Sequence, residues 1–364
     1  MILAEAGQNT ETPAVKGRIK MKKVAFFDTK PYDKLYFDEL KGRFDLEIKY
    51  YEYKLNSDTA LLARGCDAVC AFVNDTLDAP VIRTLYELGI GVIAMRCAGY
   101  NNIDFQESYE KIHIVRVPEY SPYAVAEHTM AMILTLNRKT HRAYIRTRDF
   151  NFSLNSLMGF DLHGRTVGVV GTGKIGRAFI DICRGFGMRI LAFDPYPMEL
   201  DAVTYVDFDT LCRESDIISL HCPLTESTRH IVNADSLKKM KDGVYIINTS
   251  RGALIESEAI LEAIKNRKVG AAALDVYEEE TDLFFEDFSG EIIQDDVLSR
   301  LLSMPNVLVT SHQAFLTREA LYNIALVTCE NLKAYFGGAP LKNEVCYQCK
   351  QGKACPKDHK QRCF

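Results

Sequence analysis

Short apolar runs alternate with longer amphipathic stretches along most of the chain, beginning at the MKKVAFFD run that starts with Met21. The short runs are typical of buried strands, and the stretches between them have helical spacing. The predicted strands span residues 23–27, 66–73, 92–96, 166–170, 189–193, 216–221, 243–248, 270–274 and 307–310. The clearest predicted helices span 32–42, 79–89, 123–138, 175–186, 257–266 and 317–336. Such alternation predicts parallel sheets covered by helices.

Two long predicted helices bracket the middle of the chain. Ser121 and Pro122 supply a cap and a first-turn residue for one helix, and the run 337–340 (GGAP) ends the other. We therefore expect an α/β fold of two Rossmann-like parallel-sheet domains, one inserted in the other, with a cleft between them. The expected segments are a disordered leader at 1–20, an outer domain at 21–119 and 317–345, an inserted domain at 120–316, and a Cys/Lys-rich tail at 346–364.

Composition narrows the class of protein. The chain has 364 residues, of which 47% are hydrophobic, so it can bury a large core. The formal charge of −5 gives no reason to expect binding to nucleic acid or to an anionic membrane. No apolar run reaches the roughly 18 residues of a membrane span, and no secretory signal is visible. Most of the eleven cysteines stand singly in apolar segments, which is typical of reduced thiols in a cytoplasmic protein.

A glycine motif follows one predicted strand directly. The strand at 166–170 runs into the segment 171–176 (GTGKIG), and a predicted helix comes next. In this G-x-G-x-x-G pattern Gly171 permits a tight turn, Gly173 lets a pyrophosphate approach, and Gly176 allows close helix–strand packing. The helix N-terminus then favours phosphate. We interpret the segment as a dinucleotide site, against the alternative of a glycine-rich turn that binds nothing.

An acidic residue follows the next strand. Asp194 comes eighteen residues after Gly176, where a carboxylate can accept hydrogen bonds from the adenosine ribose. Pro195 and Tyr196 come next, so no arginine adjoins Asp194 to pair with a 2′-phosphate. The charge favours NAD over NADP.

Three residues suited to acid–base chemistry follow strands of the middle block. Arg251 comes after the strand at 243–248, Glu280 follows the one at 270–274, and His312 follows the one at 307–310. Ligands of open parallel sheets bind beyond the carboxyl ends of the strands, so these side chains can converge. Oxidation of a 2-hydroxy acid needs a base for the hydroxyl proton and an anchor for the carboxylate. A histidine held by a neighbouring carboxylate supplies the base, and the planar fork of an arginine supplies the anchor. Taken alone, a histidine after a strand is most often a structural residue, and a single arginine or glutamate at a strand end is usually solvated.

The chain from about Met21 to about Glu344 resembles the D-isomer-specific 2-hydroxyacid dehydrogenases. The resemblance rests on five stretches, which are 96–104 (RCAGYNNID), 117–128 (VPEYSPYAVAEH), 171–176, 248–252 (NTSRG) and 274–280 (LDVYEEE). It implies an NAD-dependent enzyme with an inserted NAD-binding domain, an outer substrate domain, and pairing into a homo-oligomer through the NAD-binding domain. It also implies that Arg251, Glu280 and His312 are catalytic, with His312 as the acid/base.

The resemblance further implies a set of residues that contact the cofactor and the substrate. Asp275 matches the partner of the nicotinamide amide. Thr228 stands where the family often has asparagine. The implied cofactor residues are Gly171, Gly173, Lys174, Ile175, Gly176, Asp194, Cys222, Pro223, Thr228, Thr249, Ser250 and Asp275. The implied substrate residues are Ala98, Gly99, Tyr120, Arg251 and Phe315.

Within that family the chain is most similar to the bacterial fermentative D-lactate dehydrogenases. The similarity lies in 282–287 (DLFFED), 293–296 (IQDD) and 311–317 (SHQAFLT). It implies pyruvate and D-lactate as substrates, because Tyr120 and Phe315 would close around a methyl-sized group. Another 2-hydroxy acid (glycerate, glyoxylate or a longer 2-oxo acid) and a non-catalytic NAD-sensing protein remain alternatives.

Three features have no place in this scheme. His128 is expected to be a structural histidine on a helix, and Cys97 is given no nucleophilic role. The tail carries Cys346, Cys349, Cys355 and Cys363 among lysines, a spacing compatible with zinc or a redox pair but typical of no common zinc finger. We expect no metal and a solvated tail.

Overall fold

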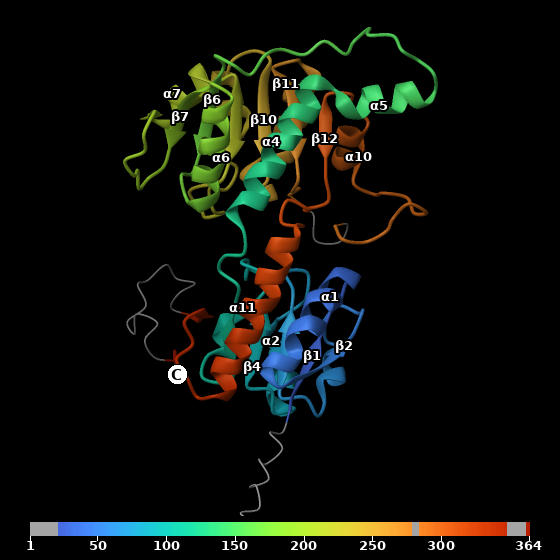
Figure 1. The fold of residues 1–364 in the computed structure, drawn as a ribbon, viewed down its shortest axis with the longest axis vertical. Helices are drawn as coiled ribbons and strands as arrows, with labels where there is room; N and C mark the ends of the chain where they lie inside the picture. Colours follow the sequence, from blue (N-terminus) through green and yellow to red (C-terminus); the bar gives the residue numbers. More distant parts are fainter. Residues whose placement is uncertain (1–20, 279–283, 348–361) are drawn as a thin grey trace, which may run out of the picture. The chain divides into compact units, whose positions relative to one another are not determined.

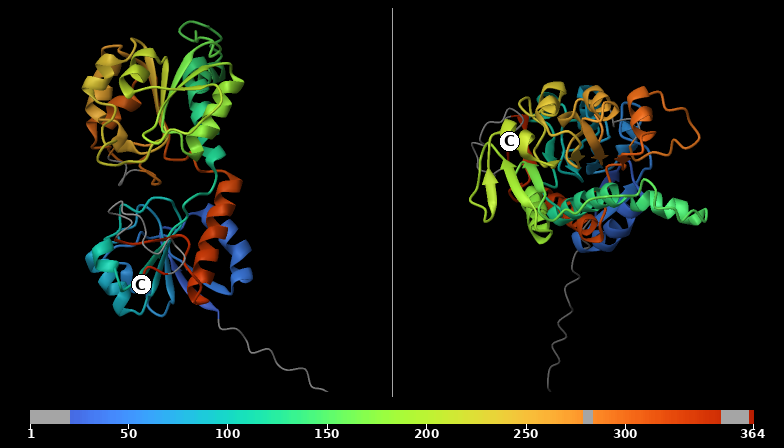
Figure 2. Two further views of the ribbon diagram at one scale, coloured as in Figure 1. Left: turned by 90° about the vertical axis from the view of Figure 1, so that its left-hand side faces the viewer. Right: turned by 90° about the horizontal axis from the view of Figure 1, so that it is seen from above.

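A computed structural model describes residues 21–278, 284–347 and 362–364. The described chain forms two compact units, one comprising residues up to Pro118 and from Ala325 onward, and the other Glu119–Ile324. Each unit is a sheet with helices on both faces (Figure 1 and Figure 2). This confirms the predicted α/β class with two parallel-sheet domains.

The first unit contains a six-stranded sheet in the order β13-β5-β4-β3-β1-β2. Its strands are β1 (Lys22–Phe26), β2 (Leu46–Tyr50), β3 (Ala68–Ala71), β4 (Val92–Met95), β5 (His113–Val115) and β13 (Glu344–Val345). Its helices are α1 (Pro31–Leu40), α2 (Ala79–Glu87) and α3 (Phe105–Ser108), together with the part of α11 (Arg318–Phe336) from Ala325 onward. All pairs are parallel except β13, which runs antiparallel to β5.

The second unit contains a seven-stranded parallel sheet in the order β12-β11-β10-β9-β6-β7-β8. Its strands are β6 (Thr166–Val170), β7 (Arg189–Phe193), β8 (Val203–Tyr205), β9 (Ile217–Leu220), β10 (Val244–Asn248), β11 (Val269–Leu274) and β12 (Val307–Val309). Its helices are α4 (Pro122–Arg138), α5 (Thr140–Arg148), α6 (Lys174–Gly185), α7 (Phe208–Glu214), α8 (Ala234–Lys239), α9 (Ser257–Lys265) and α10 (Asp296–Leu302).

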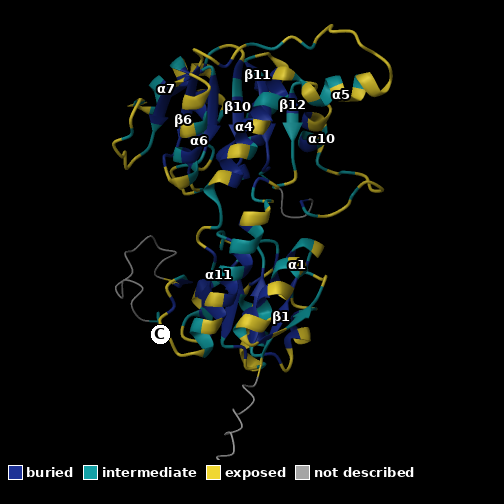
Figure 3. Ribbon diagram, viewed as in Figure 1, coloured by how far each residue is buried: buried dark blue, intermediate teal, exposed yellow. Residues whose placement is uncertain are grey.

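Successive side chains along the strands of the second unit point into two separate hydrophobic cores, one on each face of the sheet. Val167 and Val169 pack with α4 and α6 on one face, whereas Val170 packs with α7 to α10 on the other. Because successive side chains of a strand point to opposite faces, a strand covered on both sides must be apolar throughout. Figure 3 shows the resulting buried sheet between half-buried helices.

The strand order of the second sheet reverses next to β6. The chain passes from β6 to β7 and β8 on one side, and then crosses to β9, β10, β11 and β12 on the other. A crevice at such a switch point, at the carboxyl ends of the strands, is the usual ligand site of an open α/β sheet. Gly171 follows β6 at this point, and a Cβ on Gly171 would lie 2.8 Å from the backbone of His221 and of Cys222, which follow β9.

Candidate active site

The three motif glycines occupy three different environments. Gly171 has φ of +94°, a conformation that favours glycine, and a Cβ on Gly176 would lie only 2.1 Å from the Gly171 carbonyl oxygen. A Cβ on Gly173 would meet no heavy atom within 4 Å. Gly173 is the N-cap of α6 and brings no side chain to the first N–H groups of this helix, which need acceptors. The loop has the turn, the close packing and the open cradle that a pyrophosphate requires, so its residues fit NAD.

Asp194 stabilises the same glycine loop. Its Oδ2 accepts hydrogen bonds from the backbone N–H of Thr172 at 2.7 Å and from the Thr172 hydroxyl at 2.9 Å, and its Oδ1 accepts one from Tyr196 N at 2.8 Å. Burial raises the pKa of Asp194, but these hydrogen bonds outweigh burial and leave the pKa below its ordinary value. Asp194 is therefore ionised at neutral pH, and it keeps acceptor capacity for a ribose hydroxyl.

One small cavity brings together several of the predicted site residues. Its volume is about 70 Å³, and all of its lining residues belong to the second unit. The lining residues are Tyr120, Val125, Ile175, His221, Thr249, Ser250, Arg251, His312, Ala314 and Phe315. The cavity therefore combines the predicted arginine and histidine with the predicted aromatic pair and with Ile175 of the glycine loop.

The backbone that carries Arg251 is fixed by its neighbours. The Asn248 side chain donates from Nδ2 to the Arg251 carbonyl at 2.8 Å and accepts from Ser250 N at 3.0 Å. A Cβ on Gly252 would lie 1.9 Å from the Tyr277 carbonyl oxygen, so only glycine fits there. Arg251 itself donates from Nη1 to the Ser250 carbonyl at 2.7 Å. These contacts turn the chain sharply at the end of β10 and place the guanidinium at the cavity.

His312 stands in a loop that is attached to Asp275. The backbone N–H of His312 donates to the Asp275 carbonyl at 2.7 Å, and His312 has φ of +53°. The fully buried Asp275 carboxylate accepts from the Thr310 hydroxyl at 2.6 Å, from Gln313 N at 2.9 Å and from Ala314 N at 2.8 Å. The carboxylate of Asp275 therefore determines the course of the loop that presents the imidazole.

His128 completes this arrangement from α4. Its Nε2 lies 3.4 Å from both Asp275 Oδ1 and Thr310 Oγ1. Burial raises the pKa of Asp275, but hydrogen bonds from His128, Thr310 and two backbone N–H groups outweigh burial and lower it. Sequence reasoning treated His128 as structural and did not single out Thr310. The sequence signal for Thr310 was its place at the end of a predicted strand, two residues before His312.

The other predicted cofactor residues lie around the same strand ends. The Ser250 hydroxyl donates to the Cys222 carbonyl at 2.8 Å, and the Thr249 hydroxyl lies 2.8 Å from that of Thr129. Thr228 donates to the Pro223 carbonyl at 2.7 Å, which closes its own loop. The ammonium of Lys174 forms an ion pair with the Glu119 carboxylate. Contacts of these residues with a cofactor stay predictions.

The remaining predicted catalytic and substrate residues are Glu280, Ala98 and Gly99. Glu280 lies outside the described residues. Ala98 and Gly99 belong to the first unit, just beyond β4, where the Ala98 carbonyl accepts from Arg116 Nη1 at 2.9 Å and the Gly99 carbonyl from the Cys97 thiol at 3.3 Å. Their contact with substrate stays a prediction.

A family model described as "D-isomer specific 2-hydroxyacid dehydrogenase, NAD binding domain" matches residues 130–314, which is half of the chain. The chain belongs to the D-isomer-specific 2-hydroxyacid dehydrogenase family. As a member it is 53% identical to the D-lactate dehydrogenase of Escherichia coli over 89% of this chain and 99% of that protein. Its fold matches the structure of Salmonella D-lactate dehydrogenase with 53% identity, 89% and 99% coverage and a TM-score of 0.80. It also matches the pyruvate reductase of Chlamydomonas reinhardtii with 42% identity, the same coverages and a TM-score of 0.85.

Two features are absent from the described residues. In that part of the chain no helix is both long and apolar enough to cross a membrane. Within residues 21–278, 284–347 and 362–364, no three histidine, cysteine or acidic side chains are grouped so that they could hold a metal ion.

The hydrogen bonds of Asp275 lead to a prediction for Asp275→Asn. An amide nitrogen cannot accept the hydrogen bond from Ala314 N, so one buried N–H loses its partner, at a cost of about 1–3 kcal/mol in the free energy of unfolding. Because folding lowers the pKa of Asp275, its stabilising effect is present above the ordinary value of 3.8 and is lost as the pH falls through the folded value. Urea unfolding should therefore separate variant and wild type at pH 7, with the gap closing in acid. Exposed Asp161→Asn is the control, and a gap that persists unchanged at pH 2–3 would contradict the argument.

Proposed function

We propose that the protein is an NAD-dependent D-lactate dehydrogenase that transfers hydride reversibly between NADH and pyruvate. The observation that carries the proposal is the single cavity in which Arg251, His312, Tyr120 and Phe315 meet next to the glycine loop. The names of the relatives from Escherichia coli and Salmonella support the same activity.

Each side chain has a chemical task in this reaction. NADH, when bound, supplies the hydride for C2 of the keto acid. The His312 imidazolium donates its proton to the keto oxygen and recovers one in the reverse direction. The Arg251 guanidinium binds the carboxylate or polarises the ketone through its planar fork. Glu280 is proposed to orient His312, and the backbone N–H groups near Ala98 and Gly99 to receive the substrate carboxylate.

Two aromatic rings favour a small substrate. Tyr120 and Phe315 both line the cavity, and their ring centroids lie 6.3 Å apart in an edge arrangement. The Tyr120 backbone is held from α11, where Asn323 Nδ2 donates to its carbonyl at 2.7 Å. We propose that a wall of this kind accepts a methyl group and disfavours a longer side chain.

The substrate proposal is tested with NADH and a series of 2-oxo acids of increasing length. Pyruvate should oxidise NADH and give the D isomer of lactate, and each added methylene should lower kcat/KM by about tenfold or more. Faster turnover of 2-oxobutyrate or a longer acid would replace pyruvate as substrate while keeping the reaction class. NADH binding without turnover of any 2-oxo acid would instead favour an NAD-sensing protein.

Coenzyme choice follows from Asp194. Its lowered pKa keeps it ionised, so a 2′-phosphate next to its carboxylate would meet like charge. We propose that NAD is preferred over NADP for this reason.

We also propose that the protein is a homo-oligomer that pairs through the second unit. Figure 1 and the right view of Figure 2 show α5 and the segment after it extending away from the rest of this unit. We call residues 140–158 the arm, and it exposes several apolar side chains. Soluble monomers rarely expose large apolar patches. The exposed apolar side chains of this arm are Tyr144, Ile145, Phe150, Phe152, Leu154 and Met158, each 60–86% exposed.

The double variant Phe150→Ser, Met158→Ser should move the protein toward a smaller species in sedimentation velocity, because it removes the apolar contacts of the arm. Ile292→Ser, at an equally exposed residue outside the arm, is the matched control. An unchanged sedimentation coefficient in the double variant would exclude the arm as the interface. A cytoplasmic location is proposed because cysteines of the described residues such as Cys66, Cys70 and Cys183 carry free thiols.

A further inference from the structure

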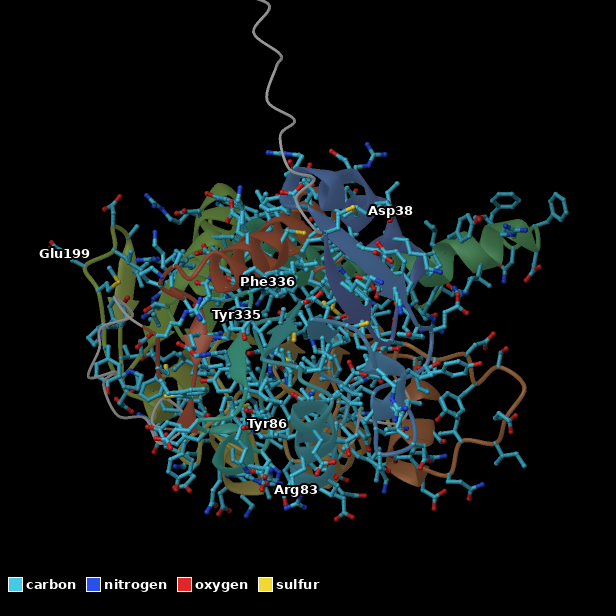
Figure 4. All side chains as sticks on the ribbon, turned by 90° about the horizontal axis from the view of Figure 1, so that it is seen from below. Asp38, Arg83, Tyr86, Glu199, Tyr335 and Phe336 are labelled. Carbon is cyan, nitrogen blue, oxygen red and sulfur yellow. The ribbon has the colours of Figure 1, made fainter. Side chains whose placement is uncertain are left out.

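The described end of the C-terminal tail packs against the first unit. Arg362 Nη2 donates to the Tyr335 carbonyl at 2.6 Å, Arg362 Nε donates to the Ala339 carbonyl at 3.2 Å, and the guanidinium lies 5.0 Å from the Tyr335 ring centroid. Figure 4 labels Tyr335 near the C-terminal end of α11, where helix carbonyls need donors. Phe364 stacks on the His113 ring at 4.2 Å and 9°. The expectation of a solvated tail is therefore wrong for residues 362–364.

Glu344 connects these last residues to the sheet. It lies on β13, is 2% exposed, and its Oε1 is 2.5 Å from His113 Nδ1 on the neighbouring strand β5. Its second oxygen accepts a hydrogen bond from the backbone N–H of Cys363 at 2.6 Å. A buried carboxylate with partners on both oxygens holds the backbone of Cys363 beside the edge of the sheet.

This docking brings two cysteines together. Cys346 follows β13 directly and is 7% exposed, whereas Cys363 is half-buried. The Cys363 thiol is in hydrogen-bonding contact with the side chains of both Cys346 and Glu344. The other described cysteines are not in this cluster, so the pair is a distinct feature of the first unit.

We propose that Cys346 and Cys363 are a redox site that forms a reversible disulfide and fastens the C-terminus covalently to β13. This goes beyond the dehydrogenase activity and does not depend on it. The oxidant is a low-molecular-weight disulfide. The more accessible Cys363 sulfur attacks it, forms a mixed disulfide and releases one thiol. The Cys346 sulfur then displaces the second thiol, so the protein loses two hydrogens and the oxidant is reduced to two thiols.

The surroundings of Cys363 predict slow oxidation at neutral pH. Burial, followed by the Glu344 carboxylate and Cys346, raises the pKa of the Cys363 thiol. The thiolate is the attacking species, so a raised pKa lowers its fraction. The pair should therefore stay reduced in a reducing compartment and respond to sustained oxidation.

The experiment uses the full-length protein incubated with glutathione disulfide or with dithiothreitol, followed by alkylation of free thiols and non-reducing peptide mapping. We expect a Cys346–Cys363 linkage only in the oxidised sample, and a rise in the melting temperature that dithiothreitol reverses. Cys363→Ser should abolish both, and because the hydroxyl replaces a half-buried thiol it should fold normally. Cys66→Ser, at a cysteine of the first unit that is 7% exposed and lies outside this cluster, is the control and should keep the linkage.

Three results would overturn the proposal. Both thiols could still react with the alkylating reagent after prolonged oxidation, which would show that no disulfide had formed. Cys346 or Cys363 could pair with Cys349 or Cys355 instead. Elemental analysis could show stoichiometric zinc that protects both thiols from alkylation.

Discussion

Replacing His312 with glutamine should lower kcat for pyruvate by about 10²–10⁴-fold, because the variant loses the general acid of the reaction. Glutamine keeps a hydrogen-bonding group of similar reach but cannot deliver a proton at neutral pH. The loop should survive the change, since Asp275 holds it through hydrogen bonds from the Thr310 hydroxyl and from backbone N–H groups. NADH affinity, measured by fluorescence titration, should therefore stay close to that of the wild type.

His163→Gln is the matched control for this variant. His163 is an exposed residue of the same unit, outside the cavity, and its substitution should leave kcat unchanged. If His312→Gln weakened NADH binding as much as it slowed turnover, the histidine would be a binding residue and the proton transfer would belong to another group.

Arg251→Lys should lower kcat/KM for pyruvate by about 10- to 100-fold, mainly through KM. An ammonium is a point charge that cannot reproduce two parallel hydrogen bonds to a carboxylate. Losing one hydrogen bond to a charged group costs about 1.5–3 kcal/mol, which gives this range. Steady-state kinetics with NADH saturating measures the effect.

Arg213→Lys on α7 serves as the control, because Arg213 is exposed and lies outside the cavity. Arg251→Lys kinetics equal to those of Arg213→Lys would show that Arg251 does not anchor the substrate. A large drop in the melting temperature of Arg251→Lys would instead indicate that Arg251 supports the fold at the end of β10.

The sequence predicted the parts of the fold where the structure restricts which residue types can occupy a position. The glycine motif was readable because Gly171 needs a positive φ and Gly176 cannot carry a Cβ, so only one residue type serves at each position. The strands β6 and β9 are buried at every position and β11 at every position but Gly270, so all three stand out as nearly continuous apolar runs. The sequence indicated Arg251 and His312 because each follows a predicted strand, and both residues line the cavity.

The missed elements are short or lie at sheet edges. Strand β2 reads LEIKY and β8 reads VTY, and neither has a continuous apolar run because its side chains are only partly buried. The three residues of β5 and the two of β13 are too few for a periodic signal.

Long-range polar contacts were also beyond sequence reasoning. The Asp275–Thr310 bond joins residues 35 positions apart, and His128 reaches the same group from α4. The Glu344–His113 contact spans 231 positions, and Glu344 also accepts the hydrogen bond from Cys363 N that holds this tail residue beside the sheet. Such partners are fixed by topology, and no local pattern of the single sequence encodes them.

The central claim is that His312 and Arg251 act together on a three-carbon keto acid. A crystal structure of the protein with NAD and oxamate, an unreactive isostere of pyruvate, tests it most directly. The account predicts that the His312 imidazole hydrogen-bonds the oxamate oxygen that stands for the keto group, while the Arg251 guanidinium contacts the same ligand. Bound oxamate with the imidazole turned away from it would contradict the account.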